Sequence, residues 1–383
     1  DPAMRLAVSS SAGLTPLADD AGLASQPTLS RCAAMLARPA NLKVLREATL
    51  ELAGRNLRVE NGGARRDRIT LDVDSLPIEV HGHQAKAEWN GHYGARIYHP
   101  LVTSIAETGD MLDARLRPGN VGTADGALDV ILDVVDRATA SLCKITHVRI
   151  DAGFPSGALM AGLDGRGVHY VARLRANAAL DRLAAPHMKR PPGRRPMEPR
   201  MWTHELTHQA SSWDEPRRVV LVVKERPDDL LLDRFFLVTS ISRFQMNGQA
   251  LLDYYRQRGK AEGHMGELMD VLNPALSSTN RAKSHVRGKK PKTAAPAVDA
   301  FACNEVRLLI AMLAYQIMHV ARRAMARATE TAWSLRRLRE RVLRGGARLV
   351  TSARRATLIL AGAVAPFWAA IWPQIQILRG ASP

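Results

Sequence analysis

Cysteine is scarce in this chain. Only Cys32, Cys143 and Cys303 occur in 383 residues, and none of them belongs to a CxxC pair. An odd total without close pairs argues against a disulfide framework and against a zinc ribbon. The chain therefore fits a reducing cytoplasm.

Acidic residues are also in short supply. Lys and Arg number 54 against 37 Asp and Glu, which gives a formal net charge of +17 and a sequence pI near 10.5. This excess favours a polyanionic partner, and nucleic acid is the first candidate. Because hydrophobic residues make up 46% of the chain, the charge belongs to a folded protein of two or three domains.

A secretory leader and a long apolar helix are missing as well. The opening DPAMRLAVSS has no apolar core and no leading Met, so no signal peptide is expected, and the sequence is expected to begin inside a longer protein. The uncharged stretch 356–378 contains two prolines and two glutamines. We predict a buried strand followed by a short helix with Phe367, Trp368 and Trp372 packed inward, and no membrane span.

Alternating polarity indicates the first strand of a core. In ITLDVDSL, residues 69–76, apolar and polar residues alternate, as in a strand with one buried face, so Asp72 and Asp74 project from the same face. Two further strand-like runs lie at 95–107 and 113–119. Together the three runs predict an antiparallel meander.

Helical and strand patterns alternate after the meander. Helical spacing of apolar residues in 123–142 is followed by the strand THVRIDAGF, which reaches Asp151, a helix near 157–163 and the strand HYVARL. This order predicts an α/β fold in which helices cover a mixed sheet.

Composition divides the rest of the chain. Residues 186–200 carry five prolines and five Lys or Arg, and strand-like runs follow them. Between two later helical regions, RAKSHVRGKKPKT (281–293) has six basic residues and no acid, which indicates a solvated loop or a DNA-facing arm. The predicted parts are an N-terminal helical part (1–60), the first part of the core (61–175), a β-rich insertion (176–240), the last core helices (241–330) and a basic C-terminal segment (331–383).

Three carboxylates form the main candidate for a metal site. Asp74 lies on the first strand, Asp151 ends the fourth, and Glu262 completes a Y-x2-R-x3-E pattern with Tyr255 and Arg258. Residues spaced three and four apart share one face of a helix. Mg2+ prefers oxygen ligands, and two such ions roughly 3.5 to 4 Å apart activate a water or a DNA 3′-hydroxyl for displacement at phosphorus. Arg258 is suited to hold a phosphate beside them.

Here the chain resembles a known family, the bacterial insertion-sequence transposases of the DDE class that carry a large β-rich insertion before the last catalytic Glu. Four segments carry the resemblance in the same order: GLASQPTLSR, LDVDSLPIEVHGHQAKAEWNGHYGARIYHPL, VRIDAGFPSGALM and the Y-x2-R-x3-E helix. It covers about residues 1–350. It implies an RNase H-like core with Asp74, Asp151 and Glu262 as catalytic, metal-binding residues.

The resemblance also implies DNA contacts. Tyr255 and Arg258 are expected near the DNA backbone. The family often has a Lys seven residues after the Glu, whereas this chain has Met269. Lys260 and His264 are the nearby candidates for that lost contact.

Each carboxylate has a rival interpretation. Asp72 shares the strand face of Asp74 and is an alternative or a supporting residue. Asp151 could also be a turn residue at a strand end, but Gly153 and the resemblance favour catalysis. Glu262 could also be a solvated partner of Arg258, and Glu267 lies on the same predicted helix, but Glu262 is favoured.

Other side chains invite weaker hypotheses. A zinc site at His81, His83, His92 and His99 is disfavoured because no cysteine or carboxylate cluster accompanies them. Trp202 and Trp213 either pack in the protein, which we favour, or stack on a flipped base at a DNA end. The run LRRLRERVLR is either a solvated helix face or a phosphate contact.

The expected function follows from the resemblance. It implies a homodimer on DNA that binds terminal inverted repeats, cleaves with Mg2+, for which Mn2+ substitutes, and joins the 3′ ends to target DNA. Two metal ions are expected, and the location is the bacterial cytoplasm, on the nucleoid when the protein is bound to DNA. Two alternatives stay open: a metal-dependent nuclease, and a transposase-derived DNA-binding protein without catalysis.

Overall fold

The computed structural model describes residues 26–82, 84–194, 196–279, 299–352 and 355–380. The chain divides into two compact units, one of Arg46–Gly266 and one of Asp1–Leu45 with Glu267–Pro383. The basic segment 281–293, His83 and the first four residues of GLASQPTLSR lie outside the described residues.

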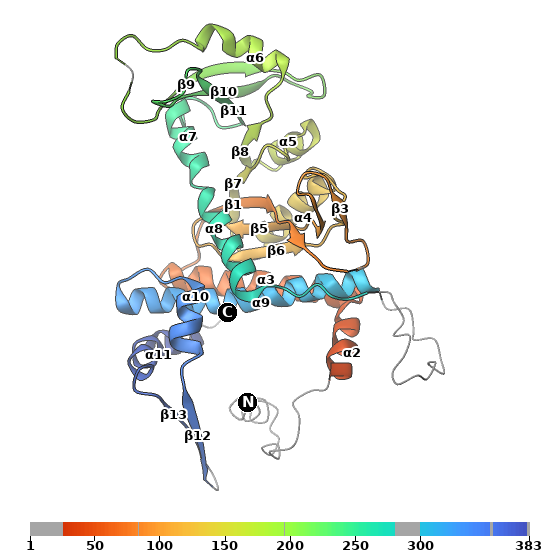
Figure 1. Cartoon of the computed structure of the whole chain (residues 1–383), viewed down its shortest axis with the longest axis vertical. Coiled ribbons are helices and arrows are strands. Elements are labelled where there is room, and N and C mark those ends of the chain that lie inside the picture. Colours follow the sequence, from red (N-terminus) through yellow and green to blue (C-terminus); the bar gives the residue numbers. More distant parts are fainter. Residues whose placement is uncertain (1–25, 83, 195, 280–298, 353–354, 381–383) are drawn as a thin grey trace. The chain divides into compact units, whose positions relative to one another are not determined.

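A mixed eight-stranded sheet forms the centre of the unit Arg46–Gly266 (Figure 1). Its order is β6-β5-β1-β7-β8-β11-β10-β9. The strands are β1 (Arg68–Ser75), β5 (Leu101–Ile105), β6 (Met111–Arg115), β7 (Lys144–Ile150), β8 (His169–Leu174), β9 (Arg200–His208), β10 (Arg217–Glu225) and β11 (Asp233–Thr239). The meander β1-β5-β6 is antiparallel, whereas β7 runs parallel to β1 and to β8.

The strands of the predicted insertion continue this same sheet. β11 pairs antiparallel with β8, and β10 and β9 follow it outward. In β10, Val219, Leu221 and Val223 pack into one core cluster, whereas Val220 and Val222 pack into another. Both faces of this apolar strand are therefore buried, which explains its lack of polar alternation.

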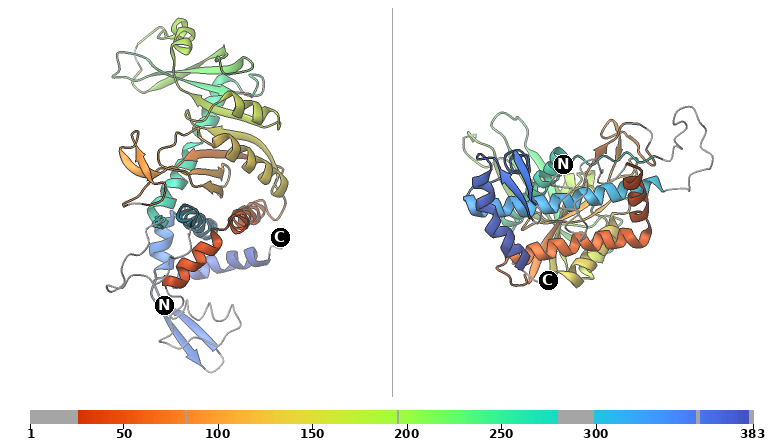
Figure 2. Two further views of the ribbon diagram at one scale, coloured as in Figure 1. Left: turned by 90° about the vertical axis from the view of Figure 1, so that its right-hand side faces the viewer. Right: turned by 90° about the horizontal axis from the view of Figure 1, so that it is seen from below.

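Helices cover both faces of the sheet (Figure 2). Helices α4 (Ala127–Ser141) and α5 (Gly157–Asp164), with the part of α3 (Pro39–Glu60) that follows Leu45, pack on the face of Leu71 and Val73. Helix α7 (Gly248–Arg256) packs on the other face through Leu251 and Leu252. The expected mixed α/β sheet flanked by helices is thus confirmed.

The polar face of β1 is buried too, which corrects the prediction of a strand with one buried face. Residues 69–73 are all buried, and Asp72 is only 1% exposed. The alternating pattern failed here because Asp72 is neutralised by Arg149, and a paired charge can be buried beneath a helix.

A β-bulge sets the phase of β7 against β1. Ile69 lies opposite Ile145 but Thr70 lies opposite His147, so Thr146 is the extra residue. Since alternate residues of a strand point to opposite faces, the extra residue changes which side chains reach which face. Beyond the bulge Asp72 lies opposite Arg149, so the two side chains share one face.

A small sheet follows β1 in the sequence. It consists of β2 (Ile78–Glu79), β4 (Ala95–Tyr98) and β3 (Glu88–Asn90), in that order. β4 leads into β5, and the backbone N–H of Leu76 donates to Pro100 O at 2.9 Å. The small sheet is thereby tied to the end of β1 that carries Asp74.

The second unit is mainly helical. It contains α2 (Gln26–Leu36), a π-helical turn (Leu268–Leu272), α9 (Ala300–Thr329), α10 (Leu335–Leu338), a π-helical turn (Arg339–Leu343), the hairpin β12 (Ala347–Ser352) and β13 (Arg355–Leu360), and α11 (Ala365–Gly380). Phe367 and Trp368 pack against its core. Trp372 is 48% exposed, so the prediction that it packs inward was wrong.

One described helix, α9, is long and apolar enough to cross a membrane by length and composition alone. Half of its most apolar window is buried in the structure. Its buried residues include polar ones, among them Asn304, Gln316 and Arg322. These features match the core helix of a folded unit.

Candidate active site

Parallel strands β1 and β7 bring Asp74 and Asp151 to one edge of the sheet. Val73 lies opposite Ile150, and each aspartate is the next residue along its strand direction. Since neighbouring parallel strands end at the same edge, both carboxylates are delivered there by topology. The N–H of Ser75 donates to Asp74 Oδ1 at 2.8 Å.

The turn after Asp151 depends on Gly153. A Cβ on this residue would lie 2.6 Å from the Cβ of Thr123, which is closer than side chains approach. The turn then buries Phe154 in the core, and the N–H of Phe154 donates to Asp151 O at 3.2 Å. The Asp-x-Gly-Phe sequence therefore fixes the backbone that presents Asp151.

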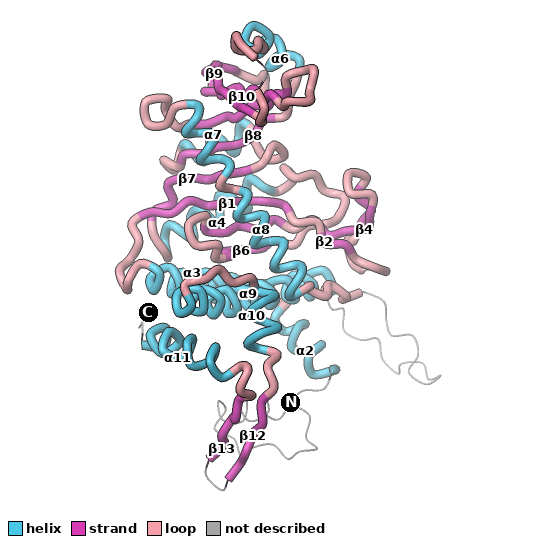
Figure 3. Tube along the Cα trace, turned by 60° about the vertical axis from the view of Figure 1, so that its left-hand side comes forward, coloured by secondary structure: helices cyan, strands magenta, loops and turns pink. Residues whose placement is uncertain are grey.

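The Y-x2-R-x3-E segment spans two consecutive helices instead of the single predicted one. The Asn247 side chain caps α7 by accepting from the N–H of Ala250 at 2.9 Å, and α7 ends at Arg256. Helix α8 begins at Gly259, after a turn in which the N–H of Arg258 donates to Tyr255 O at 3.0 Å. Figure 3 shows the two helices following one another.

Arg258 joins two of the candidate carboxylates. Its Nη2 donates to Asp74 Oδ2 at 2.5 Å, and its Nη1 donates to Glu262 Oε1 at 2.9 Å. The hydroxyl of Tyr255 donates to Asp151 Oδ1 at 3.4 Å. The structure thus brings together all five residues of the predicted constellation, with Arg258 at its centre.

The electrostatics of the site reflect crowded carboxylates. Burial raises the pKa of Asp74 to about 6; Arg258 and the Ser75 N–H oppose the rise, and the charges of Asp151 and Glu262 add to it. Burial also raises the pKa of Tyr255 to about 12, so its hydroxyl keeps its proton. Arg258 therefore compensates the negative charge of these carboxylates, whose burial without a positive partner would cost free energy.

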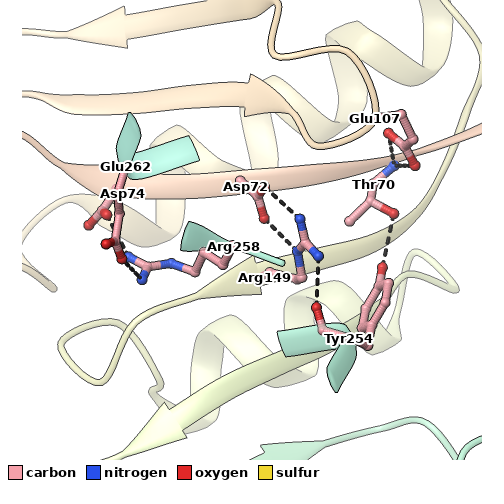
Figure 4. A network of polar contacts seen from close by, with 8 residues as sticks. All are labelled: Thr70, Asp72, Asp74, Glu107, Arg149, Tyr254, Arg258 and Glu262. Carbon is pink, nitrogen blue, oxygen red and sulfur yellow. Dashed lines mark hydrogen bonds and ion pairs between the residues drawn. The ribbon is translucent and has the colours of Figure 1, made fainter. Parts of the chain in front are cut away.

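Asp72, the rival of Asp74, belongs to a different contact. Its two oxygens accept from Nε and Nη2 of Arg149 at 2.6 and 2.7 Å (Figure 4). Both side chains are 2% exposed. A carboxylate held in this way has no face open to a ligand, so its geometry is that of a supporting residue.

The same arginine ties the strands to α7. Arg149 Nη1 donates to the backbone oxygen of Tyr254 at 2.8 Å, and its guanidinium lies 5.0 Å from the centre of the Tyr254 ring. The Tyr254 hydroxyl lies 2.9 Å from Thr70 Oγ1. We call Asp72, Arg149, Tyr254 and Thr70 the interior clamp. It fixes the helix that carries Tyr255 against the strands that carry the aspartates.

Glu267, the rival of Glu262, makes contacts inside the other compact unit. It accepts from the N–H of Leu335 at 3.0 Å and pairs with Arg322. Met269 lies in the π-helical turn Leu268–Leu272 of that unit. Glu262, by contrast, has a side chain that is 60% exposed and free to meet a ligand.

The donor set fits a hard divalent cation by chemistry, because its three members supply carboxylate oxygens. Within the part of the chain that the structure describes, no group of three or more His, Cys, Asp or Glu is arranged to hold a metal ion. The guanidinium of Arg258 takes the cationic position between Asp74 and Glu262. A cation bound by these carboxylates would therefore have to replace the contacts of Arg258.

The remaining predicted residues lie in varied settings. Lys260 is exposed on α8. His99 is buried, with Nδ1 3.1 Å from Val121 O. Trp213 is 7% exposed, and Trp202 packs partly against the same core cluster.

Sequence reasoning missed three residues of this region. Arg149 and Tyr254 form the clamp, and a charged residue inside the apolar strand HVRID was an available signal for the first. Tyr93 precedes β4 and has its pKa raised by burial and then by the charge of Asp74, which places its hydroxyl within electrostatic reach of that carboxylate. Nothing in the Gly- and His-rich sequence around Tyr93 distinguished this residue from its neighbours.

Comparisons with known proteins concern the family of the chain. A family model described as transposase DDE domain group 1 matches residues 1–379. Among curated proteins, none matches the chain. A cryo-EM structure of a piggyBac transposase synaptic complex with hairpin DNA is similar at 12% identity and a TM-score of 0.38, covering 72% of this chain and 52% of that one. The chain thus spans about half the length of that relative, and the identification comes from the family match.

Proposed function

This chain belongs to the family of transposase DDE domains, and from that premise we propose that it cuts phosphodiester bonds at transposon ends and joins the freed 3′ ends to target DNA. The observation that carries the proposal is the meeting of Asp74, Asp151 and Glu262 around Arg258 and Tyr255. These residues come from β1, the end of β7 and helices α7–α8. Such convergence of carboxylates from distant segments is typical of a metal-dependent site.

We propose that Asp74, Asp151 and Glu262 hold Mg2+, or Mn2+ in its place, and that two ions are bound. Such ions lower the pKa of a water or 3′-hydroxyl nucleophile and stabilise the leaving oxygen. The carboxylates supply hard oxygen donors on strand ends and a helix, elements that hold side chains in register. Tyr255, which keeps its proton, orients Asp151 by donating to it.

Arg258 has a second role in this proposal. Without DNA it compensates the charges of Asp74 and Glu262. A scissile phosphate offers the guanidinium a bidentate partner of equal charge, so the arginine exchanges carboxylate for phosphate when DNA binds. Exposed Lys260, two residues further on, is proposed to contact the same DNA backbone.

The partners follow from the family. We propose that the protein binds the terminal inverted repeats of its own element and acts as a homodimer on paired ends. The net charge of +17 supports a duplex DNA partner through counterion release. We propose action in the bacterial cytoplasm, at the nucleoid.

The test is cleavage of end-labelled DNA carrying the element's terminus, with Mg2+ or Mn2+. The variants Asp74→Asn, Asp151→Asn and Glu262→Gln keep the shape of each side chain and remove its charge. We expect each to abolish cleavage and joining. The exposed Asp129→Asn on α4 is the matched control and is expected to cleave like the wild type.

Two outcomes would replace the proposal. Cleavage without covalent attachment of labelled 3′ ends to a second DNA would make the protein a nuclease. Binding of duplex DNA that leaves every phosphodiester intact, in the wild type and with both metals, would make it a transposase-derived binding protein.

A further inference from the structure

A hollow of about 450 Å3 lies at the other end of β1 from Asp74. Its wall includes Arg65, Arg66 and Arg68, together with Thr70, Thr146 and Tyr254. Arg68 begins β1, and Asp74 follows six residues later, which at 3.3 Å per residue is about 20 Å along the strand. The hollow is therefore separate from the carboxylate site.

The charge of the hollow is predominantly positive. Lys144 lies opposite Arg68 in the sheet and adds a fourth cation beside the three arginines. Two acids also line the hollow, Asp67 and Glu107. Glu107 is already engaged, because its oxygens accept from the N–H of Thr70 at 2.9 and 3.1 Å.

A histidine in the lining, His147, has its pKa shifted in the direction that this charge predicts. The pKa of His147 is lowered to about 4, first by burial and then by His169, Arg68 and Arg149. A cationic ligand is disfavoured in such surroundings, whereas an anion is attracted. The electrostatics and the lining residues both indicate that the ligand is negatively charged.

We propose that this hollow, the arginine hollow, binds a backbone phosphate of duplex DNA. Guanidinium groups pair with phosphate in a bidentate manner. The lining matches backbone contacts, which position a duplex without reading its sequence. The inference rests on the proposed function, since it names a second point of contact for the same DNA.

The spacing gives the contact a place on the DNA. About 20 Å corresponds to roughly six base pairs at 3.4 Å per base pair. A duplex that runs along β1 with its scissile phosphate at Asp74 would therefore bring a phosphate about half a helical turn away to the arginine hollow.

The hollow also shares a wall with the interior clamp. Thr70 and Tyr254 line it, and their hydroxyls lie 2.9 Å apart (Figure 4). Tyr254 in turn holds Arg149 through its backbone oxygen. A phosphate in the hollow thus lies beside the residues that fix α7, the helix leading to Arg258.

The test is the salt dependence of duplex binding. The whole chain in EDTA binds a 30-base-pair duplex of arbitrary sequence, and Kd is measured by fluorescence anisotropy from 50 to 300 mM KCl. Each phosphate contact contributes about 0.9 to the log–log slope, so Arg66→Gln/Arg68→Gln is expected to reduce the slope by about 1. Arg65 is left intact because its Nε holds Leu142 O at 2.6 Å.

Two further variants separate a binding effect from misfolding. Arg166→Gln/Arg182→Gln removes equal charge after α5 and on helix α6 (Ala178–Ala184). Arg166 already pairs with Asp136, and this variant is expected to keep the wild-type slope. Asp67→Asn removes the unengaged acid of the hollow and is expected to tighten duplex binding, the opposite direction from the arginine variant. A folding defect cannot produce both signs.

The outcomes are distinct. A wild-type slope in Arg66→Gln/Arg68→Gln overturns the arginine hollow as a DNA site and leaves the proposed function standing. AMP is the second probe. If the wild type binds AMP, and Arg66→Gln/Arg68→Gln loses AMP binding but keeps duplex binding, the arginine hollow is also overturned as a DNA site, because its ligand is then a free nucleotide. Absence of duplex binding by the wild type overturns both the hollow and the proposed function.

Discussion

Two carboxylates on β1, two residues apart, each pair with a buried arginine but differ in their own exposure. The side chains of Asp72 and Arg149 are both 2% exposed. The side chain of Arg258 is 7% exposed, but its partner Asp74 is 19% exposed and its other partner Glu262 is 60% exposed. The interior pair is closed to exchange, whereas the edge contacts are open to solvent on their carboxylate side.

The difference shows that depth, and not residue type, assigns the role. A buried ion pair that loses one partner leaves a charge without compensation. At the edge the remaining partner recovers hydration or a ligand. Asp72 therefore stabilises the packing of β1, β7 and α7, whereas the carboxylate of Asp74 is accessible to a ligand.

The largest effect is expected from Arg149→Met. This change leaves Asp72 buried and unpaired, so the free energy of unfolding should fall by about 3 to 5 kcal/mol. Urea denaturation at pH 7 measures it. The matched variant Asp72→Leu/Arg149→Met removes both charges and should recover most of the loss, and equal destabilisation by the double variant would contradict the interior role.

Arg258→Gln tests the edge pair. The free energy of unfolding should fall by about 1 to 3 kcal/mol, the usual cost of charged hydrogen bonds. Because a positive charge no longer competes, Mn2+ should bind the DNA-free protein about thirtyfold more tightly, equivalent to about 2 kcal/mol of Coulomb energy between a divalent and a monovalent cation at 4 Å in water. Isothermal titration calorimetry measures this affinity. Unchanged Mn2+ binding would mean that the guanidinium does not occupy the cation's place.

The pKa of Asp74 makes the edge pair sensitive to pH. Burial raises it from 3.8 to about 6, so the folded state binds this proton more tightly than the unfolded state does. The stabilisation from this group is fully present below pH 3.8 and is lost as pH rises through 6. Relative to wild type, Asp74→Asn should therefore gain stability between pH 4 and pH 7.

Cleavage should show the opposite trend, since the proposed metal ligand is the ionised carboxylate of Asp74, and should fall as pH drops below about 6. Thermal unfolding of the wild type and of Asp74→Asn at each pH measures the difference in stability. A difference that does not change with pH would show that folding does not raise the pKa of Asp74.

The smallest effects are expected from the adjacent tyrosines. Tyr254→Phe loses the 2.9 Å contact with Thr70 inside the clamp and should cost about 1 kcal/mol. Tyr255→Phe loses the longer 3.4 Å contact with Asp151 and should cost less stability but more activity. Urea denaturation measures the loss of stability in both variants, and cleavage of end-labelled DNA measures their loss of activity. Equal effects of the two variants on both measurements would contradict the separate roles of Tyr254 in stability and Tyr255 in activity.

Much of the site was predictable because its residues carry local signals. Asp74 ends an alternating strand, Asp151 precedes Gly153 in a turn, and Glu262 is spaced from Arg258 on a helical path. The mixed sheet flanked by helices followed from the order of strand and helix patterns. The assignment of the three carboxylates as a catalytic triad stays a prediction that the variants above test.

The rest could not be predicted because it depends on long-range packing. Arg149 pairs with Asp72 across 77 residues, and no local pattern reports such a partner. The alternation around Asp72 therefore indicated a solvent-facing side chain. The strands from the predicted insertion likewise read as a separate element, because the pairing of β11 with β8 is invisible before the chain folds.

Thr146, the extra residue of the bulge in β7, determines the parity of everything that follows it in that strand. Deleting it would remove the bulge and keep His147 opposite Thr70 and Arg149 opposite Asp72. Inserting one residue after His147 would instead move Val148 opposite Asp72 and turn Arg149 to the face of Leu71 and Val73. For anyone transplanting or recombining this strand between related chains, the length from Thr70's partner His147 to Asp151 is the quantity to preserve.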